Sequence, residues 1–285
     1  MRYAQTAGHS YIWASGGASM HTAKGKRAIR VRSVFISDVH LGSRDSRAAE
    51  LLQFLASVEV EYLFLVGDII DFWSLRKNFY WPQQHNEVVR AILGKAREGA
   101  RVIYVPGNHD DDMREFCGSV FGNLQIRRKY VHATADGREL LVMHGDELDA
   151  AVKCSRWLAW LGGGAYDLAL RLNRAVNGLR RLFGLPHWSF ANYLKLRLKN
   201  AVRYVEAFEH AAARAAAQRK LHGIVCGHIH RPMVRNIDGI LYCNDGDWVE
   251  NCTALVEEHS GRISMWSWAH AGQIGERREL AQVAA

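Results

Sequence analysis

Histidine, aspartate and asparagine side chains gather at five points of the sequence, each directly after an apolar stretch with the pattern of a β-strand. The clusters are Asp38 and His40 after VFIS, Asp68 and Asp71 after LFLVG, Asn108, His109 and Asp110 after IYVPG, His144 and Asp146 after LLVM, and His228 and His230 after GIVCG. One such cluster is typical of a hydrogen-bonded turn. Five are hard to explain in that way, because burying so many polar groups without partners costs on the order of several kcal/mol apiece. Imidazole, carboxylate and amide oxygen together suit manganese, iron or zinc better than calcium or magnesium. The residue types therefore predict a site for two divalent cations.

Strand and helix patterns alternate through the first half of the chain. Residues 31–38, 61–68 and 101–108 have strand patterns, and residues 46–58 and 86–99 have helical spacing. The order β-α-β-α-β favours a sheet of mostly parallel strands. Ligands in open α/β sheets collect at the carboxyl ends of the strands, so the polar clusters are expected to meet at one edge.

Further strands are predicted in the second half. Residues 125–134 and 138–146 have the pattern of a hairpin around Asp136 and Gly137. A strand pattern returns at 221–228, and short β segments continue to Trp268. These strands extend the α/β domain, which we expect to span residues 31–268.

Residues from about 147 to 219 form a predicted helical, Trp-bearing and basic insertion in that domain. Between Lys153 and Lys220 the chain has 13 Lys and Arg against 3 Asp and Glu, a net charge of +10 in a chain of net charge +8, so the remainder carries about −2. Two apolar stripes at helical spacing flank GLPHW (184–188): Leu168, Leu172, Val176, Leu179 and Phe183, then Leu194, Leu198, Val202, Val205 and Phe208. One interpretation is a cap with an apolar groove and a basic rim. The other is a helical hairpin that packs its stripes on itself, with solvated Lys and Arg outside.

The composition argues against a membrane-spanning or secreted protein. No apolar run reaches the roughly 18 residues that a membrane span needs. Residues 1–30 lack the apolar core of a secretory signal and are expected to be a disordered leader, with 269–285 as a C-terminal tail. The five cysteines are odd in number and form no C-x-x-C pair, which favours the reducing cytoplasm.

The five polar clusters resemble the motifs of the calcineurin-like metallophosphoesterase family in type and in order. The matching pieces are SDVH (37–40), GDIID (67–71), GNHD (107–110), MHGD (143–146) and GHIH (227–230). The resemblance runs from about residue 33 to 250. It implies an α/β fold with a four-layer sandwich, in which two β-sheets are flanked by helices, here with a helical cap insertion.

The resemblance also implies a role for each residue. Seven side chains would be metal ligands: Asp38, His40 and His230 on one ion, Asn108, His144 and His228 on the other, and Asp68 bridging the two. His109 would be the catalytic histidine that is not a ligand. Two metals roughly 3.5–4 Å apart lower the pKa of a shared water and so generate a hydroxide that attacks phosphorus in line. His109 would neutralise the developing charge or protonate the leaving group.

Three carboxylates next to these motifs have two interpretations. Asp71, Asp110 and Asp146 could hold ligand imidazoles in orientation by hydrogen bonds. For Asp110 and Asp146, a cap on a turn or a helix is an equal alternative.

The GHIHRP ending (227–232) and the basic insertion are similar to the UDP-2,3-diacylglucosamine hydrolase branch of the family. That likeness implies cleavage of a nucleotide-linked glycolipid, with the insertion as a cap over the acyl chains and a peripheral contact with the cytoplasmic face of the inner membrane. Candidate substrate-binding residues are Arg174, Arg180, Arg181, Trp188, Lys195, Lys199 and Arg231. The chain departs from the branch at His109, where those enzymes usually carry arginine, and in the spacing of the insertion.

Two alternatives remain at the level of sequence. The first is a phosphodiesterase acting on nucleic acid or cyclic nucleotides, with the basic segment following a phosphate backbone. The second is a binding protein on this fold without activity. Such a protein is expected to have lost ligands, and all the expected ligand positions are intact here.

Overall fold

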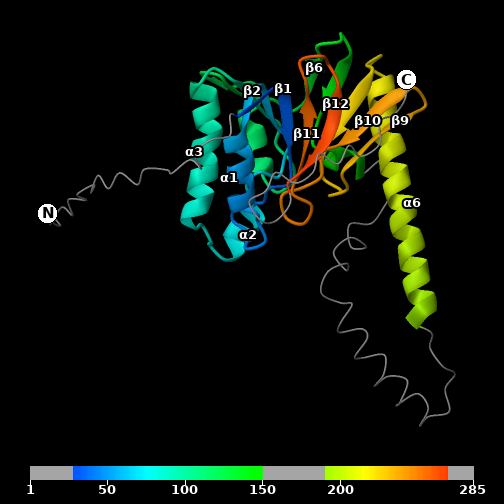
Figure 1. The fold of residues 1–285 in the computed structure, drawn as a ribbon. Helices are drawn as coiled ribbons and strands as arrows, with labels where there is room; N and C mark the ends of the chain where they lie inside the picture. Colours follow the sequence, from blue (N-terminus) through cyan, green and yellow to red (C-terminus); the bar gives the residue numbers. More distant parts are fainter. Residues whose placement is uncertain (1–27, 150–189, 269–285) are drawn as a thin grey trace, which may run out of the picture.

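The computed structural model describes residues 28–149 and 190–268, the side chains of 190–200 excepted. Two mixed β-sheets form the centre, with α1 (Ala48–Ser57) and α3 (Gln83–Arg97) on one side and α6 (Phe190–Ala217) on the other (Figure 1). The seven-stranded sheet has the order β12-β11-β1-β2-β3-β5-β4, and the five-stranded sheet has the order β6-β7-β8-β10-β9. This is the predicted α/β sandwich of two sheets flanked by helices.

The first sheet comprises β1 (Ile29–Ile36), β2 (Val58–Leu65), β3 (Arg101–Tyr104), β4 (Val120–Phe121), β5 (Leu124–Ile126), β11 (Thr253–Glu257) and β12 (Ile263–Ser267). The second comprises β6 (Tyr130–Ala133), β7 (Glu139–Val142), β8 (Gly223–Cys226), β9 (Met233–Ile237) and β10 (Ile240–Asn244). The short helix α2 (Phe72–Lys77) and the 3-10 turns η1 (Asp111–Phe116) and η2 (Asp146–Leu148) lie in the loops.

Three apolar clusters fill the three spaces between these layers. Leu51, Phe54 and Leu55 of α1 pack on the outer face of the first sheet, because their spacing places them on one side of the helix. Phe35 and Phe64 belong to the cluster between the sheets, where their rings stack at 4.5 Å between centroids. A third cluster joins Phe208 and the neighbouring alanines of α6 to the second sheet. Strands covered on both faces are apolar without alternation, as residues 34–36 show.

Parallel pairing brings the polar clusters together as predicted. Strands β1, β2 and β3 pair in parallel in the first sheet, and β7, β8 and β10 pair in parallel in the second. Their carboxyl ends lead into the loops that carry Asp38, Asp68, Asn108, His144 and His228. Both sheets therefore contribute to one polar edge.

The hairpin predicted at 125–134 and 138–146 is confirmed only in part. Strands β6 and β7 pair antiparallel around Asp136 and Gly137. Gln125 and Ile126, however, lie in β5 of the first sheet, so the predicted first strand crosses from one sheet to the other. The polar stretch from Arg127 to Lys129 connects β5 to β6. The strand periodicity alone did not show that the chain passes from one sheet to the other there.

Of the segment predicted to be an insertion, the structure describes residues 147–149 and 190–219. Within it, α6 confirms the helix that carries the second apolar stripe, and Phe208 is fully buried against the second sheet. Val202 is 50% exposed, and the N-terminal half of α6 extends beyond the sheets (Figure 1). The first stripe and the segment 150–189 lie outside the described residues. No helix among the described residues is long and apolar enough to cross a membrane.

A buried ion-pair network ties the two sheets together away from the polar edge. Glu257 of β11 is fully buried and accepts hydrogen bonds from Arg32 Nη1 (2.6 Å), Ser33 Oγ (2.5 Å) and the amide of Ala135 (2.8 Å). His132 Nε2, from β6 of the other sheet, lies 2.7 Å from the same carboxylate. Burial alone would raise the pKa of Glu257, but the hydrogen bonds from His132 and Ser33 outweigh it and lower that pKa to about 2.

We predict that Glu257→Gln lowers the free energy of unfolding at pH 7 by roughly 1–3 kcal/mol, because charge-assisted bonds are lost in a buried position. The folded-state pKa is lowered, so the stabilisation is present above pH 4.5 and is lost as the pH falls toward 2. Urea unfolding between pH 7 and pH 3 measures both. Glu59→Gln, in an exposed ion pair with Arg30, is the control and should change little. A difference between wild type and Glu257→Gln that stays constant down to pH 3 would contradict this.

Candidate metal centre

The first group of predicted ligands comes together from loops of both sheets. Asp38, His40 and His230 each offer a ligand atom, and these atoms lie within 4.8 Å of one another. His230 Nε2 is 3.1 Å from Asp38 Oδ1, and His40 Nε2 is 3.9 Å from the same oxygen. The loops after β1 and β2 run side by side, since the Asp38 amide donates to the Gly67 carbonyl and the His40 amide to the Asp68 carbonyl.

The second group lies beside the first. Asp68, His144 and His228 form another cluster whose candidate ligand atoms lie within 4.8 Å of one another. Val66 O is 2.8 Å from His144 Nδ1, an arrangement that leaves Nε2 to face the Asp68 carboxylate at 3.3 Å. His228 Nε2 is 2.9 Å from Asp149 Oδ2, a contact that a bound cation at that nitrogen would replace.

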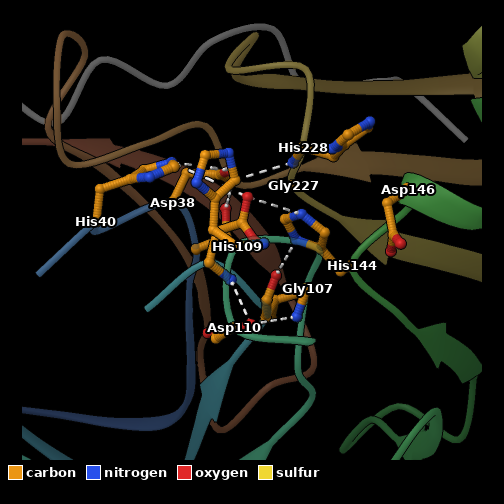
Figure 2. A network of polar contacts seen from close by, with 12 residues as sticks. Asp38, His40, Gly107, His109, Asp110, His144, Asp146, Gly227 and His228 are labelled. Carbon is orange, nitrogen blue, oxygen red and sulfur yellow. Dashed lines mark hydrogen bonds and ion pairs between the residues drawn. The ribbon is translucent and has the colours of Figure 1, made fainter. Parts of the chain in front are cut away.

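Asp68 lies between the two groups. Its Oδ2 atom is 4.0 Å from His40 Nε2 of the first group and 3.3 Å from His144 Nε2 of the second. Its Oδ1 atom accepts a hydrogen bond of 2.8 Å from the amide of His109. This is the position that a bridging carboxylate requires. Figure 2 shows Asp38, His40, His109 and His144 converging on one space.

Unsatisfied polar atoms occur in the loops around this space. Among the described residues, His40 Nε2, His144 Nε2 and Asn108 Oδ1 are buried without a hydrogen-bond partner. A buried polar group left in this state costs about 1–3 kcal/mol. The three atoms are an imidazole nitrogen from each group and an amide oxygen, which are ligand types of divalent transition metals. The residues therefore fit a pair of cations.

The backbone of the ligand loops is strained. Asp38, His40, Asp68, His228 and His230 all have φ between 50° and 70°, in the left-handed region. A residue other than glycine in such a conformation costs on the order of 1–3 kcal/mol. The sheet framework holds each loop in this shape, and that turns the side chains toward the common space.

Close packing around the ligands explains the motif glycines. A Cβ atom on Gly107 would meet Asp68 Oδ1, with His144 Cδ2 at 2.7 Å. A Cβ on Gly227 would meet Ser37 Oγ and Asp38 Oδ2. The backbone of one ligand loop thus lies directly against the side chains of another.

Buried carboxylates set the electrostatics of the site. Burial alone would raise the pKa of Asp38, but the hydrogen bond from His230 and the nearby imidazole of His40 hold it well below its ordinary value. Burial likewise opposes the charge on His40, yet Asp38 and Asp71 raise its pKa to about 10. The pKa of His144 is raised well above its ordinary value, mainly by Asp68, against the effect of burial. The carboxylates therefore favour positive charge on the imidazole nitrogens beside them.

Asp71 contacts two imidazoles. Its Oδ1 atom is 3.0 Å from His109 Nδ1, and its Oδ2 atom is 3.4 Å from His40 Nδ1. The same carboxylate caps α2 by accepting from the amide of Ser74 at 2.8 Å. Burial would raise the pKa of Asp71, but the bonds from His109 and His40 lower it far below its ordinary value. Asp71 can therefore hold both rings in orientation.

The other two carboxylates differ from Asp71, and of the two only Asp110 accepts hydrogen bonds from backbone amides. Asp110 accepts from the amides of Gly107 (2.5 Å) and Ile69 (2.8 Å) and from Tyr104 Oη (2.5 Å), so it braces two ligand loops from behind. Burial, and then repulsion from Asp68, raises the pKa of Asp110. Asp146 forms a two-oxygen ion pair with Arg114 at 2.8 Å and lies apart from the imidazoles in Figure 2. Neither carboxylate makes a hydrogen bond to an imidazole in the described part of the chain.

A sixth polar strand end was missed at the level of sequence. Asn244 is the last residue of β10, Asp245 and Asp247 follow it, and all three are buried. Ser37 Oγ joins Asp38 (2.5 Å) to Asp245 (2.7 Å), and Asn244 Nδ2 donates to the Gly227 carbonyl at 2.6 Å. The segment YCNDGDW obeys the same rule of polar residues after an apolar strand, so the signal was present.

The predicted substrate-binding residues are not brought together by the described structure. Arg231 is exposed, one residue beyond His230. Lys195 and Lys199 lie in α6, but their side chains are outside the described residues. Arg174, Arg180, Arg181 and Trp188 lie in the segment 150–189, which the structure does not describe.

Comparison with known proteins decides the family. The model of the family described as calcineurin-like phosphoesterase matches residues 31–232. The chain belongs to this family. It is a metal-dependent phosphoester hydrolase, and its two ligand groups are consistent with the use of divalent metal.

Two curated relatives carry the name UDP-2,3-diacylglucosamine hydrolase. A UDP-2,3-diacylglucosamine hydrolase of Neisseria gonorrhoeae is 28% identical over 240 residues, which cover 79% of this chain and 92% of that protein. One from Salmonella agona is 23% identical over 252 residues, covering 85% and 93%. Among solved structures, Vacuolar Protein Sorting 29 from Cryptosporidium parvum matches with a TM-score of 0.42 at 12% identity, covering 85% of this chain and 92% of that one. Likeness at this level does not bear on function.

We predict that Gly107→Ala loses metal and lowers phosphodiesterase activity by about 100-fold or more, because the new methyl group displaces Asp68 and His144. Metal analysis of the purified protein and turnover of an aryl phosphodiester measure the two effects. Gly94→Ala is the matched control, since a Cβ there meets nothing within 4 Å. Full metal content and activity in Gly107→Ala would contradict the packing described for the ligand loops.

We further predict that metal binding releases protons. His40 and His144 have raised pKa values in the metal-free protein, and a nitrogen must be unprotonated to bind a metal. The apparent affinity should therefore rise with pH between 6 and 9, with roughly one proton or more released near pH 7. Calorimetry in buffers of different ionisation enthalpy counts the protons. The exposed His259 is a control position, and His259→Gln should leave the count unchanged. Heats that do not depend on the buffer would refute the electrostatic description.

Proposed function

We propose that this chain hydrolyses the pyrophosphate bond of UDP-2,3-diacylglucosamine, or of a similar nucleotide-linked lipid, and releases UMP. The observation that carries the chemistry is the Asp68 carboxylate between two groups of ligand side chains. Support for the substrate comes from the relatives, which bear the name of this hydrolase and match over most of their length.

Each side chain has a role in this proposal. Asp38, His40 and His230 would hold one cation, Asn108, His144 and His228 would hold the other, and Asp68 would be a ligand of both. When bound, the cations supply a hydroxide nucleophile near neutral pH and neutralise charge on the phosphoryl oxygens. His109 lies beside the ligands with Nδ1 on Asp71, so its Nε2 atom is the one that can give a proton to the leaving oxygen.

We propose manganese as the metal, with iron or zinc as substitutes. The predicted ligands are imidazole nitrogens, carboxylates and one amide oxygen, without a thiolate, and this mixture suits these ions. Magnesium prefers an almost complete oxygen shell, which five histidines near the site do not provide.

The proposal includes the place of the reaction. The segment from Lys153 to Lys220 carries a net charge of +10, which would attract an anionic lipid surface. We therefore propose a cytoplasmic protein that contacts the inner face of the membrane through the helical segment and takes its lipid substrate there.

A second candidate is a phosphodiesterase acting on nucleic acid or cyclic nucleotides. The same basic segment favours it, because phosphate-backbone binding depends on clustered Lys and Arg. His109 also favours it, since the chain differs there from the arginine of the lipid-cleaving branch.

The test is turnover of UDP-2,3-diacylglucosamine by the purified protein with Mn²⁺, with Asp68→Ala as the inactive control. We expect UMP release by the wild type, lowered by about 1,000-fold or more in Asp68→Ala because that carboxylate serves both ions. Cleavage of an aryl phosphodiester that depends on Asp68, with no UMP release from the lipid, would overturn the substrate and keep the chemistry. Cleavage of oligonucleotides with a steep salt dependence would support the second candidate.

A further inference from the structure

Three side chains contact His109: Asp71 and Trp73, which lie outside the two ligand groups, and His40, which belongs to the first group. Its Nδ1 atom lies 3.0 Å from Asp71 Oδ1. The ring of His40 meets it edge-on, with centroids 4.6 Å apart and planes at 80°. The indole of Trp73 lies against it with centroids 4.2 Å apart and planes at 34°. The contact with Trp73 has no part in the roles assigned so far.

A single hydrogen bond does not fix an imidazole. The bond to Asp71 sets the distance of Nδ1 from one oxygen, but two side-chain torsions place the ring and the second is broad for histidine, so the far nitrogen can still swing. A flat aromatic group against one face removes that freedom at low entropic cost, because the indole is rigid. Asp71 and Trp73 together define both the position and the plane of the ring.

The first turn of α2 and its N-cap supply the contacts with Trp73 and Asp71 from one short segment. Asp71 is the N-cap of the helix, and the amide of Phe72 donates to the His109 carbonyl at 3.1 Å. Trp73 follows directly. None of the residues of α2 is buried, and Trp73 is 37% exposed. Core packing therefore does not explain why a large aromatic residue stands here.

We propose that Trp73 is a positioning residue, which holds the face of the His109 ring so that Nε2 points at the leaving oxygen of the phosphoester. The inference rests on the proposed role of His109 as the proton donor, but not on the lipid substrate. Trp73 acts through His109 in this proposal and makes no contact with the reacting atoms.

The test compares leaving groups of different basicity. A poor leaving group, such as an alkoxide, needs protonation, whereas p-nitrophenolate hardly does. Trp73→Ala should lower kcat for an alkyl phosphodiester by about 10- to 100-fold and for bis-p-nitrophenyl phosphate by about threefold or less, with little change in KM. Trp73→Phe should restore most of the loss. Phe79→Ala, at an aromatic side chain 78% exposed, is the matched control and should behave as wild type.

A double-mutant cycle and a spectrum make the test specific. In a His109→Ala background, Trp73→Ala should add less than about twofold, because the effect passes through the absent ring. The His109 ring protons of the metal-free protein should show an upfield ring-current shift that Trp73→Ala removes. Equal losses for both leaving groups, an additive effect with His109→Ala, or unshifted ring protons would each overturn the proposal. Turnover of both aryl and alkyl esters without UMP release would reject only the lipid substrate, so the two proposals fail separately.

Discussion

The buried carboxylate of Asp68 is the interaction on which the rest of the site depends. It is almost inaccessible to solvent and faces an imidazole from each ligand group, so its negative charge has to be balanced by protons or by cations. Burial opposes ionisation, yet the charge on His144 keeps the pKa of Asp68 below its ordinary value. A buried carboxylate that stays ionised attracts positive charge strongly. The sheets, the motif glycines and the strained loops hold the ligand side chains in place around this charge.

Holding that arrangement requires a rigid framework. The ligand loops adopt left-handed backbone at five positions and pack backbone against side chain at Gly107 and Gly227, which costs free energy. The cost is offset by three apolar layers and by the Glu257 network that fastens one sheet to the other. Stability and function are thus divided between the two ends of the sandwich.

Much of this could be predicted because strand ends obey a simple rule. An apolar stretch followed by Asp, His or Asn marked Asp38, Asp68 and His144, and the structure brings these residues together. The same rule would have found Asp245 if it had been applied to the last parallel strand. Asp110 could not be separated from Asp71 in this way, because the difference lies in what surrounds each carboxylate. Asp110 faces backbone amides, and Asp71 faces imidazoles. The roles of Trp73 and Glu257 arise from contacts between segments that are far apart in the sequence. A local sequence pattern does not reveal such contacts.

The central claim is that one carboxylate joins two metal ions. Electron paramagnetic resonance of the protein titrated with Mn²⁺ tests it most directly, because two ions sharing a bridging ligand are magnetically coupled. The account predicts two bound ions per chain with the multiline spectrum of a coupled pair in the wild type, and uncoupled or lost manganese in Asp68→Asn. A single uncoupled ion in the wild type, or a coupled pair that survives in Asp68→Asn, would contradict it.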